Sequence, residues 1–180
     1  MQVNVAQLLK EGIGSTRSYE VAEVVDLDTA GDGGGGLVRG EVTLTRTNRG
    51  VLAVGTFDTT VRIDCSRCLS QYGCPLQVKV QEEFFPLTDI NTGAPLSLPD
   101  EPDAFTIDEQ HILDLSEAIR QGILLVMPMK PLCREDCAGL CPQCGQNLNE
   151  KVCGCSSEII DPRWAGLASV RVRLKEQEGK

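Results

Sequence analysis

The chain has 180 residues, 41% of them hydrophobic and 4% aromatic, and a formal net charge of −9. This is enough for one domain with an aliphatic core and a small appendage. Residues 1–128 hold 9 Lys and Arg against 19 Asp and Glu, a balance of −10, whereas residues 129–180 hold 8 against 7. The acidic part argues against a sequence-independent grip on nucleic acid, which needs basic side chains against phosphates.

The opening residues, MQVNVAQLLK, lack the basic start and apolar run of a secretory signal. The longest apolar run, 123–127, is far shorter than the roughly 20 residues that a membrane helix needs. We therefore expect a cytoplasmic protein without a membrane partner. Because disulfides do not persist in a reducing cytosol, the 9 cysteines are expected to bind metal.

Four early segments have the composition of strands, at about 19–27 and over 37–45, 51–63 and 76–84. Residues 31–36 are glycine-rich, and neither Lys-Ser/Thr nor a helix follows them, so a flexible loop is expected there and not a phosphate cradle. The apolar positions expected on one face are Val38, Val42, Leu44, Val51, Ala53, Phe57, Val61, Ile63, Leu76, Val78, Val80 and Phe84.

Residues 86–110 hold four prolines and many acids, which predicts an extended connection. Within it, segment 100–109 places five acids around Phe105 and Ile107. Two interpretations stay open for this segment: a solvated linker, or a contact that steers a basic partner and anchors it by the two apolar side chains. His111, at the end of the connection, is expected to be a solvated surface residue.

An amphipathic helix is predicted after Asp114, which forms a capping-box pattern with Glu117, and it should end at Pro128. A last short helix should begin at 161–162 and carry Trp164. The apolar stripe of the first helix should pack on the sheet; it consists of Leu115, Ala118, Ile119, Gly122, Ile123 and Val126.

These elements predict an α+β fold: an antiparallel β-sheet or partial barrel with a packed helix and a C-terminal cysteine-rich zinc-binding segment. Residues 1–128 would form the sheet and helix core. Residues 129–180 would form a zinc-knuckle tail packed on that core, so that the chain is one compact unit.

The cysteines form two CxxC pairs, one of them at an expected hairpin tip, and one CxC pair. Cys74 is left over and is expected to be a plain buried thiol. Eight cysteines suffice for two four-ligand metal sites: Cys65, Cys68, Cys133, Cys137, Cys141, Cys144, Cys153 and Cys155.

Two groupings of these eight cysteines are open. In the first, 141, 144, 153 and 155 form a local site, and 65, 68, 133 and 137 join the sheet to the segment after the helix. In the second, 133, 137, 141 and 144 form one site, and 65, 68, 153 and 155 form the other. We prefer the first grouping because it closes the smaller ring, although the cost of closure grows only slowly with length.

Zinc suits closed sites made entirely of thiolates, and an iron–sulfur cluster is the alternative. Four protein ligands would leave no open position, so the sites are expected to be structural. No nucleophile is arranged with a base, so we expect no enzyme, no catalytic residue and no small-molecule substrate.

In its motifs the chain resembles the YceD-like large ribosomal RNA subunit accumulation proteins. The similar stretches, which span nearly the whole chain, are 4–9, 14–17, Cys65-Ser-Arg-Cys68-Leu69, 114–133, 137–149 and 161–163. The resemblance implies a non-enzymatic factor that supports accumulation of large-subunit (23S) ribosomal RNA and ribosome biogenesis. Its partners would be ribosomal proteins or a pre-large-subunit particle, with a direct RNA contact left open. Alternative functions are a zinc-dependent nucleic-acid-binding regulator and a thiol redox or metal-transfer protein.

Overall fold

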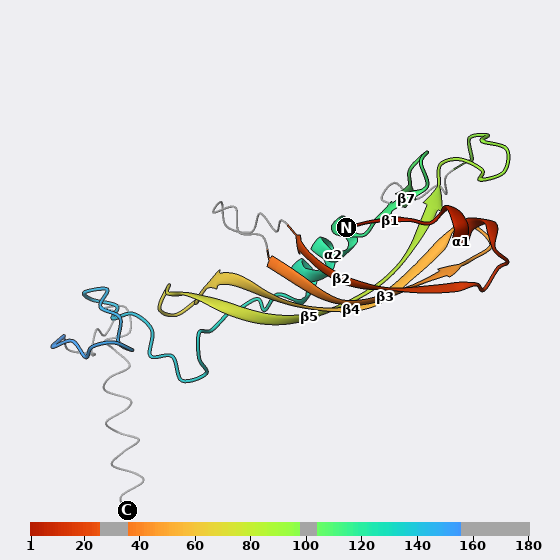
Figure 1. The fold of residues 1–180 in the computed structure, drawn as a ribbon. Helices are drawn as coiled ribbons and strands as arrows, with labels where there is room; N and C mark the ends of the chain where they lie inside the picture. Colours follow the sequence, from red (N-terminus) through yellow and green to blue (C-terminus); the bar gives the residue numbers. More distant parts are fainter. Residues whose placement is uncertain (26–35, 98–103, 156–180) are drawn as a thin grey trace, which may run out of the picture.

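The computed structural model describes residues 1–25, 36–97 and 104–155. Within these ranges the chain forms a seven-stranded sheet of order β1-β7-β6-β5-β4-β3-β2, and helix α2 lies across one of its faces (Figure 1). The elements are β1 (Gln2–Asn4), α1 (Ala6–Lys10), β2 (Thr16–Val25), β3 (Gly36–Arg46), β4 (Val51–Asp64), β5 (Gln71–Pro86), β6 (Phe105–Ile107), β7 (Ile112–Asp114) and α2 (Ser116–Val126).

Strands β2 to β5 form the predicted antiparallel meander, in which each strand pairs with the next. Burial alternates along β4 from Val51 to Val61, as expected for a strand with one face toward a core. Opposite partners on that face include Phe57 with Val78 and Val61 with Cys74. The sequence pattern therefore identified both the strands and their buried face.

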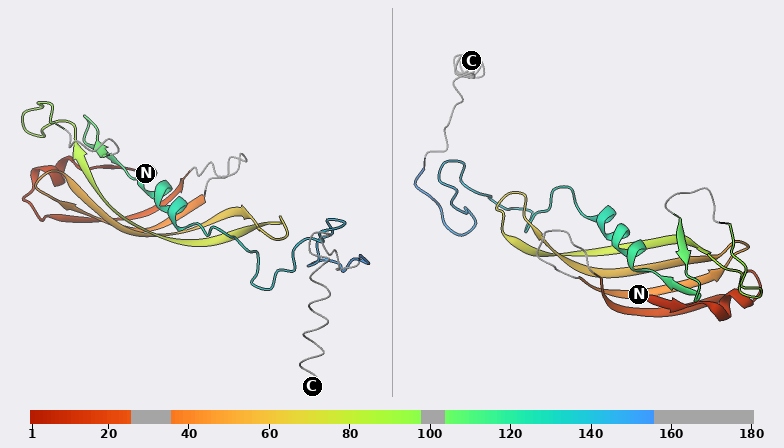
Figure 2. Two further views of the ribbon diagram at one scale, coloured as in Figure 1. Left: turned by 180° about the vertical axis from the view of Figure 1, so that it is seen from behind. Right: turned by 90° about the horizontal axis from the view of Figure 1, so that it is seen from above.

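The sheet curls, so that its two edge strands approach each other. The N-terminal amine of Met1, next to edge strand β1, lies 3.2 Å from Glu23 Oε2 on the opposite edge strand, β2. Helix α2 packs mainly on β5 and also touches β2, which places it inside the curl (Figure 2). The result is the predicted partial barrel with α2 packed in it; the short helix α1, which the sequence analysis did not predict, adds Leu8 and Leu9 to the core.

The connection after β5 is more structured than the sequence predicted. Phe105–Ile107 forms β6, which pairs with β5 in parallel, whereas the sequence favoured an antiparallel sheet throughout. Ile107 is 0% exposed, and the Phe105 ring lies 5.2 Å from that of Phe84. The hypothesis that these two side chains anchor a partner is therefore wrong, because the protein's own core uses them.

His111 is also not the solvated residue that was expected. It adopts a left-handed backbone with φ of 61°, and its Nδ1 is buried without a hydrogen-bond partner. Its carbonyl accepts a hydrogen bond from the Val5 N–H at 2.9 Å. The residue therefore belongs to the turn that carries the chain from β6 into β7.

Helix α2 follows its predicted stripe in part. Leu115, just before the helix, together with Ala118, Ile119 and Ile123, is buried. Val126 is 42% exposed, so the buried stripe ends one turn earlier than predicted. Of the glycine-rich loop predicted over 31–36, Gly36 begins β3 and the rest lies outside the described residues, as does the last helix predicted from 161–162.

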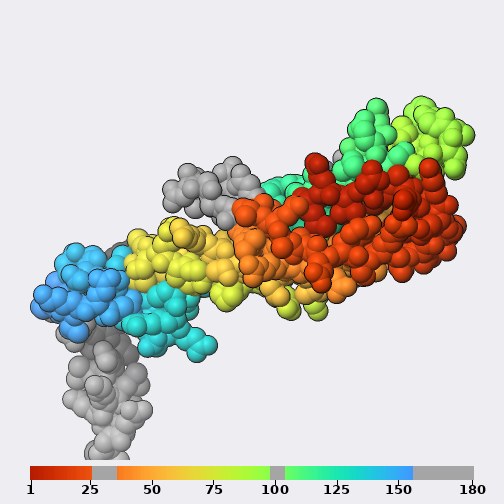
Figure 3. Space-filling view, viewed as in Figure 1, coloured from red at the N-terminus to blue at the C-terminus, as the bar shows by residue number. Residues whose placement is uncertain are grey.

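The β4–β5 hairpin is much longer than its neighbours. Strand β3 pairs with β4 only as far as Asp58, but β4 and β5 remain paired with each other to Asp64 and Gln71. The end of the hairpin is therefore a two-stranded ribbon that projects from the sheet. Residues 129–155 lie at its tip, at one end of an elongated molecule (Figure 3).

Candidate metal centres

The first centre is built on the turn at the tip of the β4–β5 hairpin. Cys65 follows β4 directly, and its carbonyl accepts a hydrogen bond from the Leu69 N–H at 2.9 Å. The Cys65 N–H donates to the Ser70 carbonyl at 3.0 Å. Leu69 has a left-handed φ of 58°, which lets the chain turn back toward β5. This turn folds the peptide around the sulfurs of Cys65 and Cys68.

The second CxxC pair repeats this turn. The Gly145 N–H donates to the Cys141 carbonyl at 2.9 Å, and the Cys141 N–H donates to the Gln146 carbonyl at 2.8 Å. Gly145 has a left-handed φ of 72°, which lets the chain turn tightly after Cys144. Leu69 and Gly145 thus hold equivalent places in the two turns.

The eight predicted cysteines come together as two groups of four. One group holds Cys65, Cys68, Cys133 and Cys137, and the other holds Cys141, Cys144, Cys153 and Cys155. Within each group the sulfurs lie within 4.8 Å of one another. This is the first of the two groupings considered above. Cys74 lies apart from both groups as a buried thiol on β5.

The spacing in the first group fits a tetrahedral ion. The sulfurs of Cys65 and Cys137 are 3.7 Å apart, as are those of Cys68 and Cys133. Four sulfurs about 2.3 Å from a central zinc ion would be separated by about 3.8 Å. The two sulfurs of a disulfide would instead lie about 2.05 Å apart. The group is therefore spaced as metal ligands are, and not as bonded pairs.

Hydrogen bonds hold the segment after α2 against the hairpin tip. The Ser66 N–H donates to the Pro131 carbonyl at 2.8 Å. The Arg67 guanidinium donates to the Cys137 carbonyl at 2.9 Å, and the Leu140 N–H donates to the Arg67 carbonyl at 3.2 Å. Cys133 and Cys137 thereby meet the CxxC pair of a distant strand turn.

The thiols in each group are electrostatically unequal. Burial raises the pKa of Cys65, but backbone hydrogen bonds from Cys133, Cys68 and Arg67 outweigh it and bring the pKa to about 6. Burial raises the pKa of Cys133 to about 12, together with the sulfurs of Cys68, Cys137 and Cys65 beside it. Several thiolates this close repel one another, and a divalent cation would offset that repulsion.

The second group shows the same contrast and is more open to solvent. Backbone hydrogen bonds from Cys144 and Gln143, with the side chain of Cys153, lower the pKa of Cys141 to about 6. The neighbouring Cys144 sulfur and then burial raise the pKa of Cys155 to about 12. Cys144 is exposed, whereas Cys65 is fully buried. The thiol chemistry of both groups fits a metal such as zinc, held without an open coordination position.

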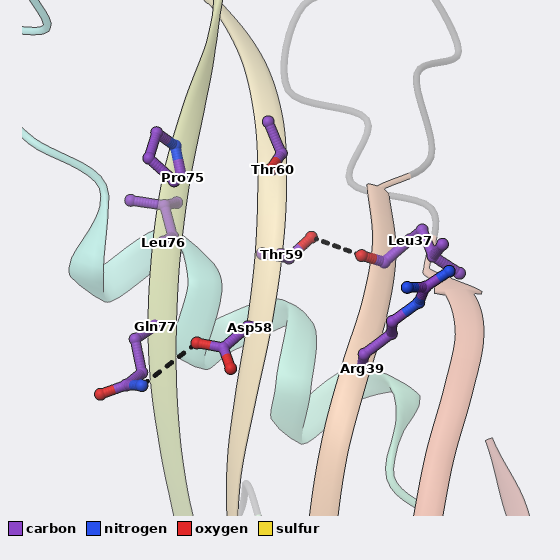
Figure 4. A pocket seen from close by; sticks show the side chains of 8 residues that line it. All are labelled: Leu37, Arg39, Asp58, Thr59, Thr60, Pro75, Leu76 and Gln77. Atoms are coloured by element: carbon purple, nitrogen blue, oxygen red, sulfur yellow. Dashed lines mark hydrogen bonds between the residues drawn. The ribbon is translucent and has the colours of Figure 1, made fainter.

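A shallow groove of about 560 Å³ lies elsewhere, across β3, β4 and β5 (Figure 4). Two of its polar contacts are internal: Gln77 Nε2 donates to Asp58 Oδ1 at 3.1 Å, and Thr59 Oγ1 donates to the Leu37 carbonyl at 3.1 Å. Its eight lining residues include neither Cys nor His. We assign this groove no chemical role.

The fold and the two groups define a class of protein: a curled β-sheet whose longest hairpin carries two four-cysteine centres. The chain belongs to the YceD family, because the family described as "Large ribosomal RNA subunit accumulation protein YceD" matches residues 53–171. The matched region begins in β4 and includes all eight clustered cysteines.

Two mycobacterial proteins are similar to this chain over two thirds of its length or more. An uncharacterized protein of Mycobacterium tuberculosis is 33% identical over 143 residues, which cover 76% of this chain and 63% of the relative. An uncharacterized protein of Mycobacterium leprae is 31% identical over 67% of this chain and 52% of its own length. The chain therefore spans less than two thirds of the length of these relatives.

A shorter match comes from Arabidopsis thaliana. The protein named "Large ribosomal RNA subunit accumulation protein YCED homolog 1, chloroplastic" is 33% identical over 67 residues, which cover 37% of this chain and 21% of the relative. No solved structure matches the chain. Among the described residues, no helix is both long and apolar enough to span a membrane.

Proposed function

We propose that this protein is a non-enzymatic factor that supports accumulation of large-subunit (23S) ribosomal RNA. We also propose that two structural zinc ions stabilise the tip of the β4–β5 hairpin and residues 129–155. Membership of the YceD family carries the ribosomal part of the proposal. The two closed groups of four sulfurs support the zinc part, because a catalytic zinc would keep one position for water or substrate.

The proposed contact is with protein. Residues 1–128, with their balance of −10, are suited to meet basic ribosomal proteins, either free or on a pre-large-subunit particle in the cytoplasm. The projecting hairpin places the two cysteine groups at one end of the molecule, away from α2 (Figure 1). Zinc there would hold this end of the molecule rigid.

The test is complementation of a strain that lacks the gene. We expect the deletion to lower the ratio of large-subunit to small-subunit ribosomal RNA, and the wild-type protein to restore it. Cys65→Ser with Cys68→Ser should fail to restore the ratio, because two of four ligands at the hairpin tip are lost. Cys74→Ala is the matched control, since Cys74 belongs to neither group, and it should restore the ratio.

Two outcomes would favour the alternative functions. A normal ratio in the deletion strain would remove the ribosomal role, and a nucleic-acid-binding regulator would then be sought by direct binding. Ready alkylation of the clustered cysteines in the zinc-loaded protein would favour thiol or metal transfer, with the exposed Cys144 as its starting point. Sedimentation of the protein with pre-large-subunit particles on a sucrose gradient would support the proposed partner.

A further inference from the structure

The two cysteine groups are joined by very little chain. Only Ala138, Gly139 and Leu140 separate Cys137 of the first group from Cys141 of the second. The loop over 145–152, enclosed between ligands of the second group, folds back on this connection. The Leu148 N–H donates to the Gly139 carbonyl at 2.9 Å, and Asn147 forms a β-bridge with Leu140. The loop of the second group therefore lies against the first.

Asn149 in this loop touches a ligand of the first group directly. Its Nδ2 donates to the Cys137 sulfur at 3.3 Å and to Asn147 Oδ1 at 2.9 Å. Its Oδ1 accepts from the Ala138 N–H at 2.8 Å and from the Arg134 guanidinium at 2.7 Å. Both of these partners are donors only, so the amide oxygen must face them and the amide N–H group must face the sulfur.

This orientation suits a metal-bound cysteine. A zinc ion with four thiolates carries a net charge of −2, and N–H groups that donate to the sulfurs stabilise that charge. Partners of this kind around a metal site typically change its affinity by about 10–100-fold when they are mutated. Cys137 is almost fully buried, which strengthens a hydrogen bond to its charged form.

We propose that Asn149 is a positioning residue that couples the two metal centres: zinc in the second group closes the loop that presents Asn149 to Cys137, and this raises zinc affinity in the first. The inference rests on the proposed zinc sites. Because the coupling is thermodynamic, zinc in the first group must raise affinity in the second by the same factor.

The coupling can be measured one group at a time in the full zinc-loaded chain. A chelator is titrated in, free thiols are alkylated, and mass spectrometry reports protection of Cys65 and Cys68 separately from Cys153 and Cys155. Asn149→Asp keeps the shape and the acceptor oxygen but turns a second oxygen toward the sulfur. We expect zinc affinity in the first group to fall by about 10–100-fold. Zinc affinity in the second group should fall by the same factor while the first group holds zinc, because the coupling is reciprocal, and alkylation of Cys153 and Cys155 reports it.

A double-mutant cycle isolates the route through the loop. Cys141→Ser with Cys144→Ser should weaken zinc in the first group, and Asn149→Asp should then add little, because the loop no longer presents residue 149. Lys151→Ala, an exposed change in the same loop, should leave both affinities unaltered. Unchanged protection of Cys65 and Cys68 in Asn149→Asp, or full additivity in the cycle, would overturn the coupling. A wild-type protein without metal would overturn the zinc proposal itself.

Discussion

At the scale of single residues, the two CxxC turns depend on one left-handed residue each. Gly145 adopts this conformation without steric cost. Leu69 adopts it at a cost of about 1–2 kcal/mol in conformational free energy, because its Cβ is crowded in the left-handed region. Leu69 is also 66% exposed, so burial of its side chain offsets little of that cost. The same turn is therefore built once with the favoured residue and once against backbone preference.

This contrast predicts opposite effects of two substitutions. Gly145→Ala should lower zinc affinity in the second group by about fivefold, or about 1 kcal/mol, because alanine resists the positive φ. An added Cβ there would meet nothing within 4 Å, so only the backbone is tested. Leu69→Gly should raise the zinc affinity of the first group, because glycine adopts the positive φ without steric cost. Both are measured by competition with a chromogenic chelator.

Gly154→Ala is the control for this pair. Gly154 lies between Cys153 and Cys155, has equally open space around its Cβ position, and does not have a left-handed φ. Its substitution should leave zinc affinity unchanged. An equal loss in Gly154→Ala and Gly145→Ala would show that the side chain, and not the backbone angle, is responsible.

At the scale of elements, helix α2 combines a favourable start with a tight contact at its centre. The Asp114 carboxylate accepts a hydrogen bond from the Ser116 N–H at 2.9 Å and another from the N-terminal amine at 3.2 Å. Glu117 does not complete the predicted capping box, because its carboxylate is bound by Arg120 and Gln121. Asp114 therefore binds the helix start without Glu117, and the Leu115 N–H, which donates to the Met1 carbonyl at 2.9 Å, and Ser116 Oγ, which accepts from the N-terminal amine, add to the connection with the N-terminus.

Asp114→Ala should lower the free energy of unfolding by about 1 kcal/mol at neutral pH, as the loss of a capping side chain does. Burial tends to raise the pKa of Asp114, but hydrogen bonds from Ser116, Gln2 and the N-terminal amine lower it to about 2. The ordinary value is 3.8, so the contribution is complete above about pH 4 and disappears as the pH falls toward 2.

Urea unfolding of the wild type and Asp114→Ala across this pH range provides the measurement. The difference between the two proteins should shrink steadily below pH 4, whatever the acid does to the cysteine groups in both. Glu117→Gln is measured beside it for comparison, because hydrogen bonds from Arg120 and Gln121 lower the pKa of Glu117 to about 2 as well, so any contribution of Glu117 should fade over the same pH range. A difference that persists undiminished at pH 2 would contradict the assigned role.

Two opposing effects decide the outcome of Gly122→Ala at the centre of α2: a gain in helix propensity and a steric clash with β5. Alanine is favoured over glycine in a helix by about 1 kcal/mol. An added Cβ, however, would lie 2.6 Å from Val78 Cγ1, and Val78 is 0% exposed with a stiff, branched side chain. Overpacking costs about 1–3 kcal/mol, so we expect Gly122→Ala to lower stability by about 1 kcal/mol.

The measurement for Gly122→Ala is again chemical unfolding, with Val78→Ala as its partner change. The double variant should be more stable than the sum of the two single effects predicts, because the added methyl would occupy space left by the valine. Strict additivity would mean that the helix does not press on Val78 at this position.

At the scale of the whole molecule, a well-buried core is connected to a weak projection. The core residues lie between the sheet and α2, whereas the end of the β4–β5 hairpin continues beyond β3 as two strands only. An isolated two-stranded ribbon has marginal stability in water. The cysteine group at its tip supplies the long-range connection that such a ribbon needs.

We expect the purified protein to hold two zinc ions, one for each group of four sulfurs, by elemental analysis. Structural zinc contributes about 10–16 kcal/mol in small peptides, compared with about 5–15 kcal/mol for a whole domain. Removal by a chelator should therefore increase amide hydrogen exchange in 59–76 and 129–155 and leave 38–57 protected. Equal loss of protection in 38–57 would contradict this separation, and iron with sulfide in place of zinc would identify the alternative cofactor.

The sequence by itself determined the long strands, their buried face and the helix, because alternation at period two and spacing near 3.6 record burial residue by residue. It also identified the eight clustered cysteines and favoured the grouping that the structure has. The assignment of residues 1–128 and 129–180 to two parts remains a prediction.

Other features depended on segments that are distant in the sequence, and only the tertiary structure decided them. Residues 105–107 look like part of an acidic connection until parallel pairing with β5 buries Ile107. Nothing local to Leu69 or Asn149 indicates a left-handed turn or a hydrogen bond to the Cys137 sulfur. Cys65 contacts Cys137 because the tip of the β4–β5 hairpin and the segment after α2 lie side by side in the folded chain. Local periodicity in the sequence carries no information about such a long-range contact.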